Sequence, residues 1–123
     1  MASLVTGIGG LFFRSKDEKA LTLWYEKHFG IPAVGGSTLW EPQGGVTVFS
    51  PFKQDSKYFP ATQQFMINFR VSDLDKFLEQ LKAEGVKIDD EKMDESYGKF
   101  AWVYDPEGNK IELWQPTDES ELT

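Results

Sequence analysis

Apolar residues in the first half of the chain follow two different periods. Residues 8–14 (IGGLFFR) form a short apolar and aromatic run, which is typical of a β-strand. From Asp17 the apolar positions recur at steps of three and four residues, which predicts a helix that ends at Gly30. These positions are Leu21, Trp24, Tyr25 and His28 or Phe29. Residues 38–40 and 46–50 then predict two short strands around a turn rich in Gly and Pro.

A similar order of elements returns after residues 52–63, which are rich in Pro, Lys, Asp and Ser and are interpreted as a linker. Because the linker carries Phe52, Tyr58 and Phe59, we expect it to lie against the rest of the protein. The pattern that follows predicts a strand, a helix, a short extended piece, an acidic loop and a closing hairpin. Their ranges are 65–71, 73–84, 86–88, 89–98, and 99–104 with 109–115.

The two halves of the chain match each other as an internal repeat. Residues 13–17 match residues 69–73 at an offset of 56, because both begin with Phe-Arg and end with Asp. The turn EPQG at 41–44 matches DPEG at 105–108 at an offset of 64. The chain therefore looks like two copies of a strand, helix and three-strand unit.

Length and composition fit one domain of the α+β class. The chain has 123 residues, of which 40% are hydrophobic and 15% aromatic, as expected for an ordered globular protein. We predict a single domain over residues 1–123, built of two βαβββ modules at about 7–51 and 64–116 with a linker at 52–63. Because neither half is expected to bury its own sheet face alone, the two modules must pair.

Charge and residue usage exclude several classes of function. The chain has 13 Lys and Arg and 20 Asp and Glu, and the resulting net charge of −7 disfavours nucleic acid and anionic membranes as partners. It has no Cys and one His, which excludes thiolate sites and any site that needs two imidazoles from one chain. With no signal peptide and no apolar run near 18 residues, we expect a cytoplasmic location.

The duplicated βαβββ unit resembles the glyoxalase/bleomycin resistance/dioxygenase superfamily, also called the vicinal oxygen chelate family. The resemblance rests on DPEGNKIELWQP at 105–116, with WYEKHFGI at 24–31 as support, and covers about residues 7–116. It implies that the modules curl their sheets around a cupped cavity that holds a ligand or metal. It also implies a homodimer.

In metal-using members of this family, four inward side chains, usually His, Gln or Glu, hold the ion. Matching the motifs places these four positions at Gly10, Thr47, Met66 and Glu112, of which Glu112 alone has the expected chemistry. Divalent metals take three or four oxygen or nitrogen ligands in such sites. The resemblance and the residues together predict that the metal site is absent and that the protein uses no cofactor.

Alternation along the strands predicts what lines the cup instead. If Glu112 faces the cup, Ile111 and Leu113 face the helices. The same rule, applied to every predicted strand, places eight ligand-binding candidates in the cup: Phe12, Phe49, Met66, Asn68, Arg70, Phe100, Trp102 and Trp114. Two structural alternatives stay open: the aromatic residues fill the cup as a closed core, or Glu112 is held in an ion pair by Arg14 or Arg70.

The leading functional hypothesis is a small-molecule binding protein in which the aromatic cup stacks on a planar or cationic compound, as in bleomycin resistance proteins. A second hypothesis is a metal-independent lyase or isomerase with Glu112 as general base and Arg70 or Lys110 holding the product anion. A metal-dependent lyase or dioxygenase with shifted ligands and a purely structural role are further alternatives. Whether the chain is an enzyme stays open, and His28 is expected to cap its helix or to meet the helix dipole.

Overall fold

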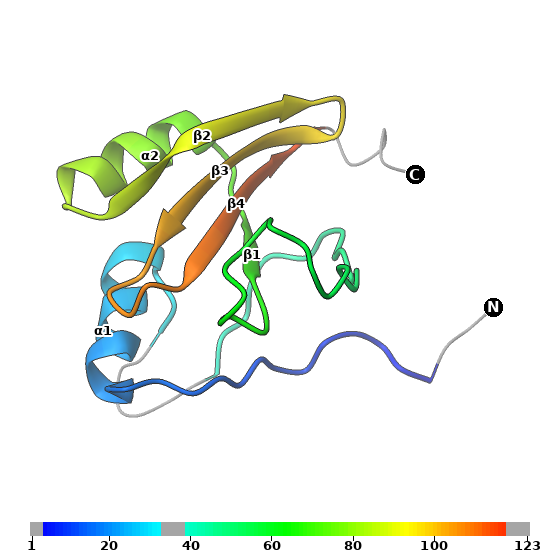
Figure 1. The fold of residues 1–123 in the computed structure, drawn as a ribbon, viewed down its shortest axis with the longest axis horizontal. Helices are drawn as coiled ribbons and strands as arrows, with labels where there is room; N and C mark the ends of the chain where they lie inside the picture. Colours follow the sequence, from blue (N-terminus) through cyan, green and yellow to red (C-terminus); the bar gives the residue numbers. More distant parts are fainter. Residues whose placement is uncertain (1–3, 33–38, 118–123) are drawn as a thin grey trace.

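The computed structural model of the protein describes residues 4–32 and 39–117 (Figure 1). The ends of the predicted domain, and residue 38 of the predicted strand at 38–40, lie outside these ranges. The fold is α+β, as predicted, and its elements run α1, β1, α2, β2, β3, β4. No helix within the described ranges is long and apolar enough to cross a membrane.

One mixed sheet of four strands forms the centre of the fold. In the order β1-β4-β3-β2, it contains β1 (Ile67–Arg70), β4 (Lys110–Pro116), β3 (Gly98–Tyr104) and β2 (Lys87–Glu95). β1 pairs parallel to β4, and the other two pairs are antiparallel. With α2 (Leu74–Ala83) joining β1 to β2, the second predicted module has the βαβββ order expected of it.

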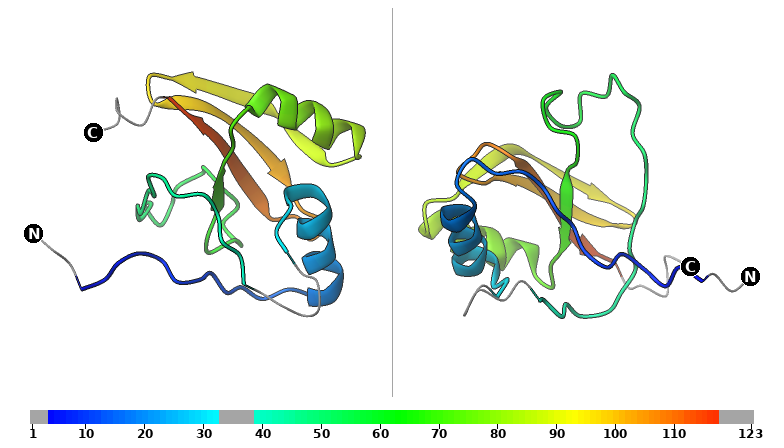
Figure 2. Two further views of the ribbon diagram at one scale, coloured as in Figure 1. Left: turned by 180° about the vertical axis from the view of Figure 1, so that it is seen from behind. Right: turned by 90° about the horizontal axis from the view of Figure 1, so that it is seen from below.

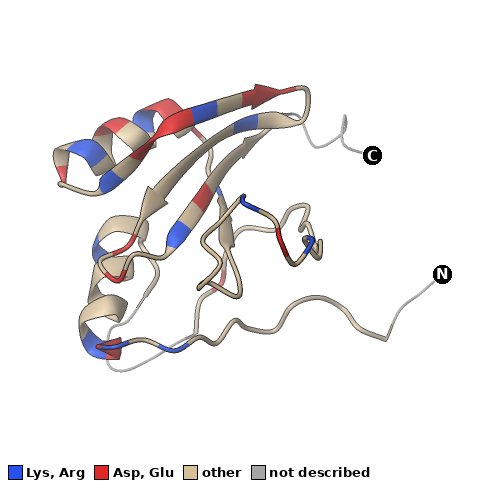
Figure 3. Cartoon of the chain, viewed as in Figure 1, with Lys and Arg blue, Asp and Glu red and all other residues tan. Residues whose placement is uncertain are grey.

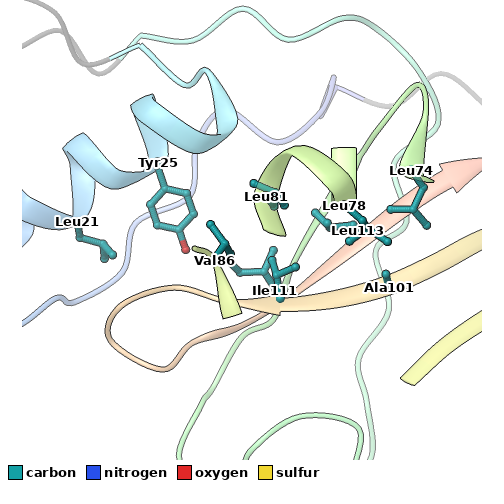
Figure 4. Close-up of a cluster of buried hydrophobic side chains, with 10 residues drawn as sticks. Leu21, Tyr25, Leu74, Leu78, Leu81, Val86, Ala101, Ile111 and Leu113 are labelled. Carbon is teal, nitrogen blue, oxygen red and sulfur yellow. The ribbon is translucent and has the colours of Figure 1, made fainter. Parts of the chain in front are cut away.

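Both helices lie on one face of this sheet. The core packs α1 (Glu18–Phe29) and α2 against the strand residues that point toward them (Figure 4). Leu81, Val103 and Leu113 are fully buried there. The alternation predicted for β3 and β4 is confirmed on this side, because Ala101, Val103, Ile111 and Leu113 all belong to the helix-side core.

The two helices begin at equivalent positions of the repeat, because their capping residues lie 56 positions apart. Asp17 caps α1 by accepting a hydrogen bond from the Ala20 backbone N–H at 3.1 Å, and Asp73 caps α2 by accepting one from Lys76 N–H at 3.1 Å. The prediction that His28 caps its own helix is wrong, because its Nδ1 lies 2.8 Å from Oε1 of Glu84 at the end of α2. His28 is buried and links the two helix ends.

The acidic segment 89–98 is not the loop that the sequence suggested. β2 runs to Glu95 and pairs with β3 along its length, with a register shift between Ile88 and Lys92. The prediction failed because backbone pairing with β3 outweighs the low strand propensity of Asp and Glu. β2 is an edge strand that carries Lys, Asp and Glu along its length (Figure 3), and these charged residues are tolerated there because most of them are exposed.

In the first predicted module, the helix forms, but the described parts of the expected strands do not. Residues 8–14, 39–40 and 46–50 have no strand pairing, and the N-terminal segment runs as an extended trace in both views of Figure 2. A strand exists only where a neighbour completes its hydrogen-bond ladder, and none of the strands β1 to β4 pairs with these residues. Their side chains are accordingly exposed, with Phe12 at 92% and Phe49 at 85%.

Candidate functional site

The sheet face opposite the helices carries a second, separate cluster of aromatic side chains. Phe100, Trp102 and Trp114 are buried in it, with Met66 and Met93 packed at its border. Phe100 and Trp102 occupy alternate positions of β3, and Trp114 pairs with Phe100 from β4. The inward-facing residues predicted for these two strands therefore share one face of the sheet. We call this surface the open face, since both α1 and α2 lie on the other side of the sheet.

Glu112 lies in the middle of the open face. The register pairs it with Asn68 of β1 on one side and Trp102 of β3 on the other. Asn68 Nδ2 donates to Glu112 Oε1 at 2.7 Å, and Trp102 Nε1 donates to Oε2 at 3.0 Å. A third donor is the hydroxyl of Tyr58, which reaches the same Oε2. Because all three donors are neutral, Glu112 is satisfied without the ion pair to Arg14 or Arg70 considered from the sequence.

Tyr58 comes from the segment 52–63, which we call the cover segment. Its ring meets Trp102 edge to face at 5.8 Å between centroids. Burial, and then the hydrogen bond to Glu112, raise the pKa of Tyr58 above its ordinary value of 10. The hydroxyl therefore stays protonated near neutral pH and acts as a donor to the carboxylate.

Lys110 and Gln63 hold the cover segment at the sheet. Lys110 Nζ donates to the carbonyl of Tyr58 at 2.7 Å and lies 5.3 Å from the centroid of the Trp102 ring. The amide of Gln63 bonds both the N–H and the carbonyl of Lys110, each at 2.9 Å. These contacts bring the segment over the open face, as the aromatic residues in the linker led us to expect.

The far end of the open face is built by a stacked pair. Phe100 and Trp114 are cross-strand neighbours whose rings are nearly parallel, 6.0 Å apart. The Trp114 indole N–H donates to the carbonyl of Tyr97 at 3.0 Å. Gly98, with φ +141°, makes this possible, because a Cβ there would lie 2.4 Å from the Trp114 indole nitrogen.

The structure brings together five of the eight predicted ligand-binding residues: Met66, Asn68, Phe100, Trp102 and Trp114. Phe12 and Phe49 lie exposed outside this cluster. The guanidinium of Arg70 donates instead to two carbonyls of the first half, those of Val46 at 2.6 Å and Gln43 at 2.9 Å. Arg70 thus ties the segment 43–46 to β1.

Sequence reasoning missed Tyr58 as a partner of Glu112. The contact joins residues 54 positions apart, and no periodic pattern marks it. The sequence feature that could have indicated this contact is the presence of three aromatic residues in a stretch otherwise typical of a linker.

Two clefts border the cover segment. A cleft of about 460 Å³ is lined by the segment itself and by Tyr104 and Lys110. Another of about 490 Å³ lies between Arg14, Pro60 and Glu107. The open face and the first cleft therefore meet at Lys110.

Of the four positions that the sequence resemblance assigned to metal ligands, three carry residues that are poor ligands for a divalent ion. Gly10 has no side-chain ligand, Thr47 has a neutral hydroxyl, and Met66 has a soft thioether. Both oxygens of Glu112 already accept hydrogen bonds. Within residues 4–32 and 39–117, no three His, Asp or Glu side chains are grouped so that they could hold an ion.

Comparisons with known proteins agree with this architecture. The profile of the Glyoxalase/Bleomycin resistance protein/Dioxygenase superfamily matches residues 7–113. TnmS3, an antibiotic binding protein from Streptomyces sp. CB03234, superposes with a TM-score of 0.63 at 22% identity, covering 94% of this chain and all 100% of its own. Lactoylglutathione lyase from Agrobacterium tumefaciens gives 0.58 at 16% identity over 92% of this chain and 96% of its own.

A third solved structure, VPC_CASS1 from the mobile metagenome of V. Pseudocholerae, has a TM-score of 0.53 at 23% identity, covering 94% of this chain and 100% of its own. At these identities the likeness shows the fold. No curated protein matches the chain.

Proposed function

The chain belongs to the glyoxalase/bleomycin resistance/dioxygenase superfamily, and from this premise we propose that it binds a small planar molecule on the open face of its sheet. One observation carries the proposal: a buried carboxylate, Glu112, is held by three neutral side-chain donors between aromatic walls. A carboxylate among aromatic rings offers a ligand both stacking surface and one directional polar contact. The antibiotic-binding TnmS3, which shares the fold, is consistent with this reading.

An aromatic ligand without a positive charge fits the open face better than a cationic one. The ammonium group of Lys110 lies 5.3 Å from the centre of the Trp102 ring and 5.5 Å from that of Tyr58. It thus occupies the place where a ligand cation would meet an aromatic face, and it would repel a second positive charge. We therefore propose a neutral or anionic aromatic compound.

We further propose that binding needs no metal. Of the four family positions, only Glu112 has a carboxylate, and its oxygens face three hydrogen-bond donors rather than an ion. Calorimetric titrations with Ni, Co and Zn should therefore show no stoichiometric binding of any of the three ions. Tight binding of one ion per chain would contradict it.

A role for Glu112 as a general base in a lyase or isomerase has less support. Tyr58 would have to leave Oε2 of Glu112 before that oxygen could accept a substrate proton, and the other two partners, Asn68 and Trp102, are neutral donors that supply no second acid or base. We therefore favour binding without chemistry.

We propose that a second copy of the chain completes the cup. Large apolar side chains of the first half are exposed, among them Phe12 at 92%, Leu39 at 82% and Phe49 at 85%. Such residues gathered over one half of a small protein are typical of an interface. Light scattering should give twice the 14.0 kDa chain mass, and Phe49→Asp should lower it toward one chain. A monomeric wild-type protein would contradict the proposal.

The test of the binding proposal is a calorimetric screen of planar aromatic compounds, with bleomycin as a cationic reference. Trp102→Ala should weaken any hit by about tenfold or more, because it removes a stacking wall and a donor to Glu112. Trp40→Ala is the matched control, since Trp40 packs on Phe69 instead and should leave affinity unchanged. Equal affinity in the wild type and Trp102→Ala would overturn the proposal.

A further inference from the structure

Tyr58 meets the open face as a ligand would. Its side chain contacts a carboxylate (Glu112), an indole (Trp102) and an ammonium group (Lys110), which belong to the sheet. The residue itself belongs to the cover segment, which forms neither helix nor strand, and it is only partly buried. A core residue, by contrast, is normally delivered by a regular element that fixes its position.

The cover segment is fixed to β4 at its end by the Gln63 amide, and five residues earlier the Tyr58 ring holds it over the open face. Its backbone hydrogen bonds, from Ser56 N–H to Lys53 and from Gln63 N–H to Pro60, stay within the segment. The carbonyl of Tyr58 reaches the sheet only through the flexible side chain of Lys110. The cleft of about 460 Å³ borders the segment beside Tyr104 and Lys110. The ring is therefore placed so that a competitor could replace it.

We propose that Tyr58 occupies the ligand position, and that the natural ligand is a phenol that displaces it. This inference rests on the proposed function and names the class of compound that the site takes. Asn68 and Trp102 keep the carboxylate of Glu112 oriented when Tyr58 leaves. Oε2, which Tyr58 vacates, then keeps the Trp102 indole as its one donor and has a free lone pair, to which a phenolic hydroxyl can donate.

The same geometry rejects rings that lack a hydroxyl donor. A methyl ether in place of the hydroxyl would turn an oxygen lone pair toward Oε2 of Glu112, and a bare ring would leave Oε2 with the Trp102 indole as its one donor. The pKa of Tyr58, raised by burial and by Glu112, is in keeping with a site that binds the protonated hydroxyl.

The experiment uses p-cresol, which is the tyrosine side chain as a free molecule, and 4-methylanisole, its methyl ether. In Tyr58→Ala, calorimetry should show p-cresol binding about tenfold or more tighter than to the wild type, and about tenfold or more tighter than 4-methylanisole. Tyr104→Ala is the matched control, because Tyr104 donates to a different carboxylate, Asp89, at 2.9 Å. It should bind p-cresol no better than the wild type.

A second variant covers the case in which Tyr58→Ala fails to fold. Tyr58→Phe keeps the ring but frees Glu112, so p-cresol should bind it more tightly than the wild type, by a smaller factor. The inference is overturned if p-cresol and 4-methylanisole bind the folded variants equally, or if the variants and the wild type bind p-cresol equally. If panel compounds still bind at Trp102, only this inference falls; if nothing binds any variant, the proposed function falls as well.

Discussion

Asp105 and Glu112 are both buried carboxylates, exposed by 5% and 7%, and each accepts a hydrogen bond from a tyrosine and an asparagine. Their remaining donors differ. Asp105 accepts the backbone N–H groups of Glu107 and Asn109 at 2.9 and 3.0 Å, whereas Glu112 accepts the indole of Trp102.

This difference separates a structural carboxylate from one suited to binding. Backbone donors at Asp105 are part of the turn between β3 and β4, so they cannot turn away without unfolding it. Every donor at Glu112 is a side chain, and one of them, the hydroxyl of Tyr58, comes from a segment without regular structure and can yield to a ligand. The four predictions below test this contrast through changes in the free energy of unfolding, taken from urea titrations.

The largest effect is expected for Asp105→Asn, which should lower the free energy of unfolding by about 2 to 3 kcal/mol. The carboxamide has one acceptor oxygen, while two fixed backbone N–H groups and the Tyr25 hydroxyl need partners. Asp89→Asn, at a half-buried carboxylate that also binds a tyrosine, should cost less than about 1 kcal/mol. Equal losses would refute the structural role of Asp105.

Tyr25→Phe should cost about 1 to 2 kcal/mol. Its hydroxyl donates to Asp105 at 2.8 Å within the helix-side core, where no water can replace it. The matched change Tyr104→Phe, at a less buried residue, should cost less than about 0.5 kcal/mol. A negligible loss in Tyr25→Phe would show that α1 does not depend on this bond.

Glu112→Gln should cost less than about 1 kcal/mol, despite a burial similar to that of Asp105. The Asn68 amide can rotate to present its oxygen to the new carboxamide, and Tyr58 can turn toward water. A loss as large as that of Asp105→Asn would assign Glu112 to the structure rather than to a ligand.

The smallest effect concerns alkaline pH. The pKa values of Tyr25 and Tyr58 are raised, first by burial and then by their carboxylate partners. A raised pKa means that each neutral hydroxyl contributes fully below about pH 10 and loses its contribution as pH rises through the folded-state value. Between about pH 9 and 11, the free energy of unfolding should therefore fall less in Tyr58→Phe than in the wild type. An identical fall would show that Tyr58 titrates normally.

The second half of the fold was predictable because its elements are defined locally. The helix-side positions of β3 and β4 follow from alternation, and both helices begin directly after a capping Asp that the repeat had marked. The open face could be predicted for the same reason, since Trp102, Glu112 and Trp114 share one side of a hairpin. Neighbouring residues on one strand need no knowledge of distant segments.

The first half could not be predicted to the same extent. Residues 8–14 and 46–50 have strand-like composition, but a strand also needs a partner, which the pattern of one segment does not reveal. The contact between Tyr58 and Glu112 was hidden for a similar reason, because it depends on where a segment without periodicity folds back.

The amide of Gln63 pairs with Lys110 as one further rung of a β-ladder would, although Gln63 belongs to no strand. Because this pairing fixes Gln63 at β4, the five positions back to Tyr58 determine how far the Tyr58 ring reaches over the open face. One glycine inserted between Pro60 and Gln63 would substitute none of the contact residues. It would nevertheless move the Tyr58 ring out of register with Glu112. Ligand preference in this protein would then be adjustable by chain length alone.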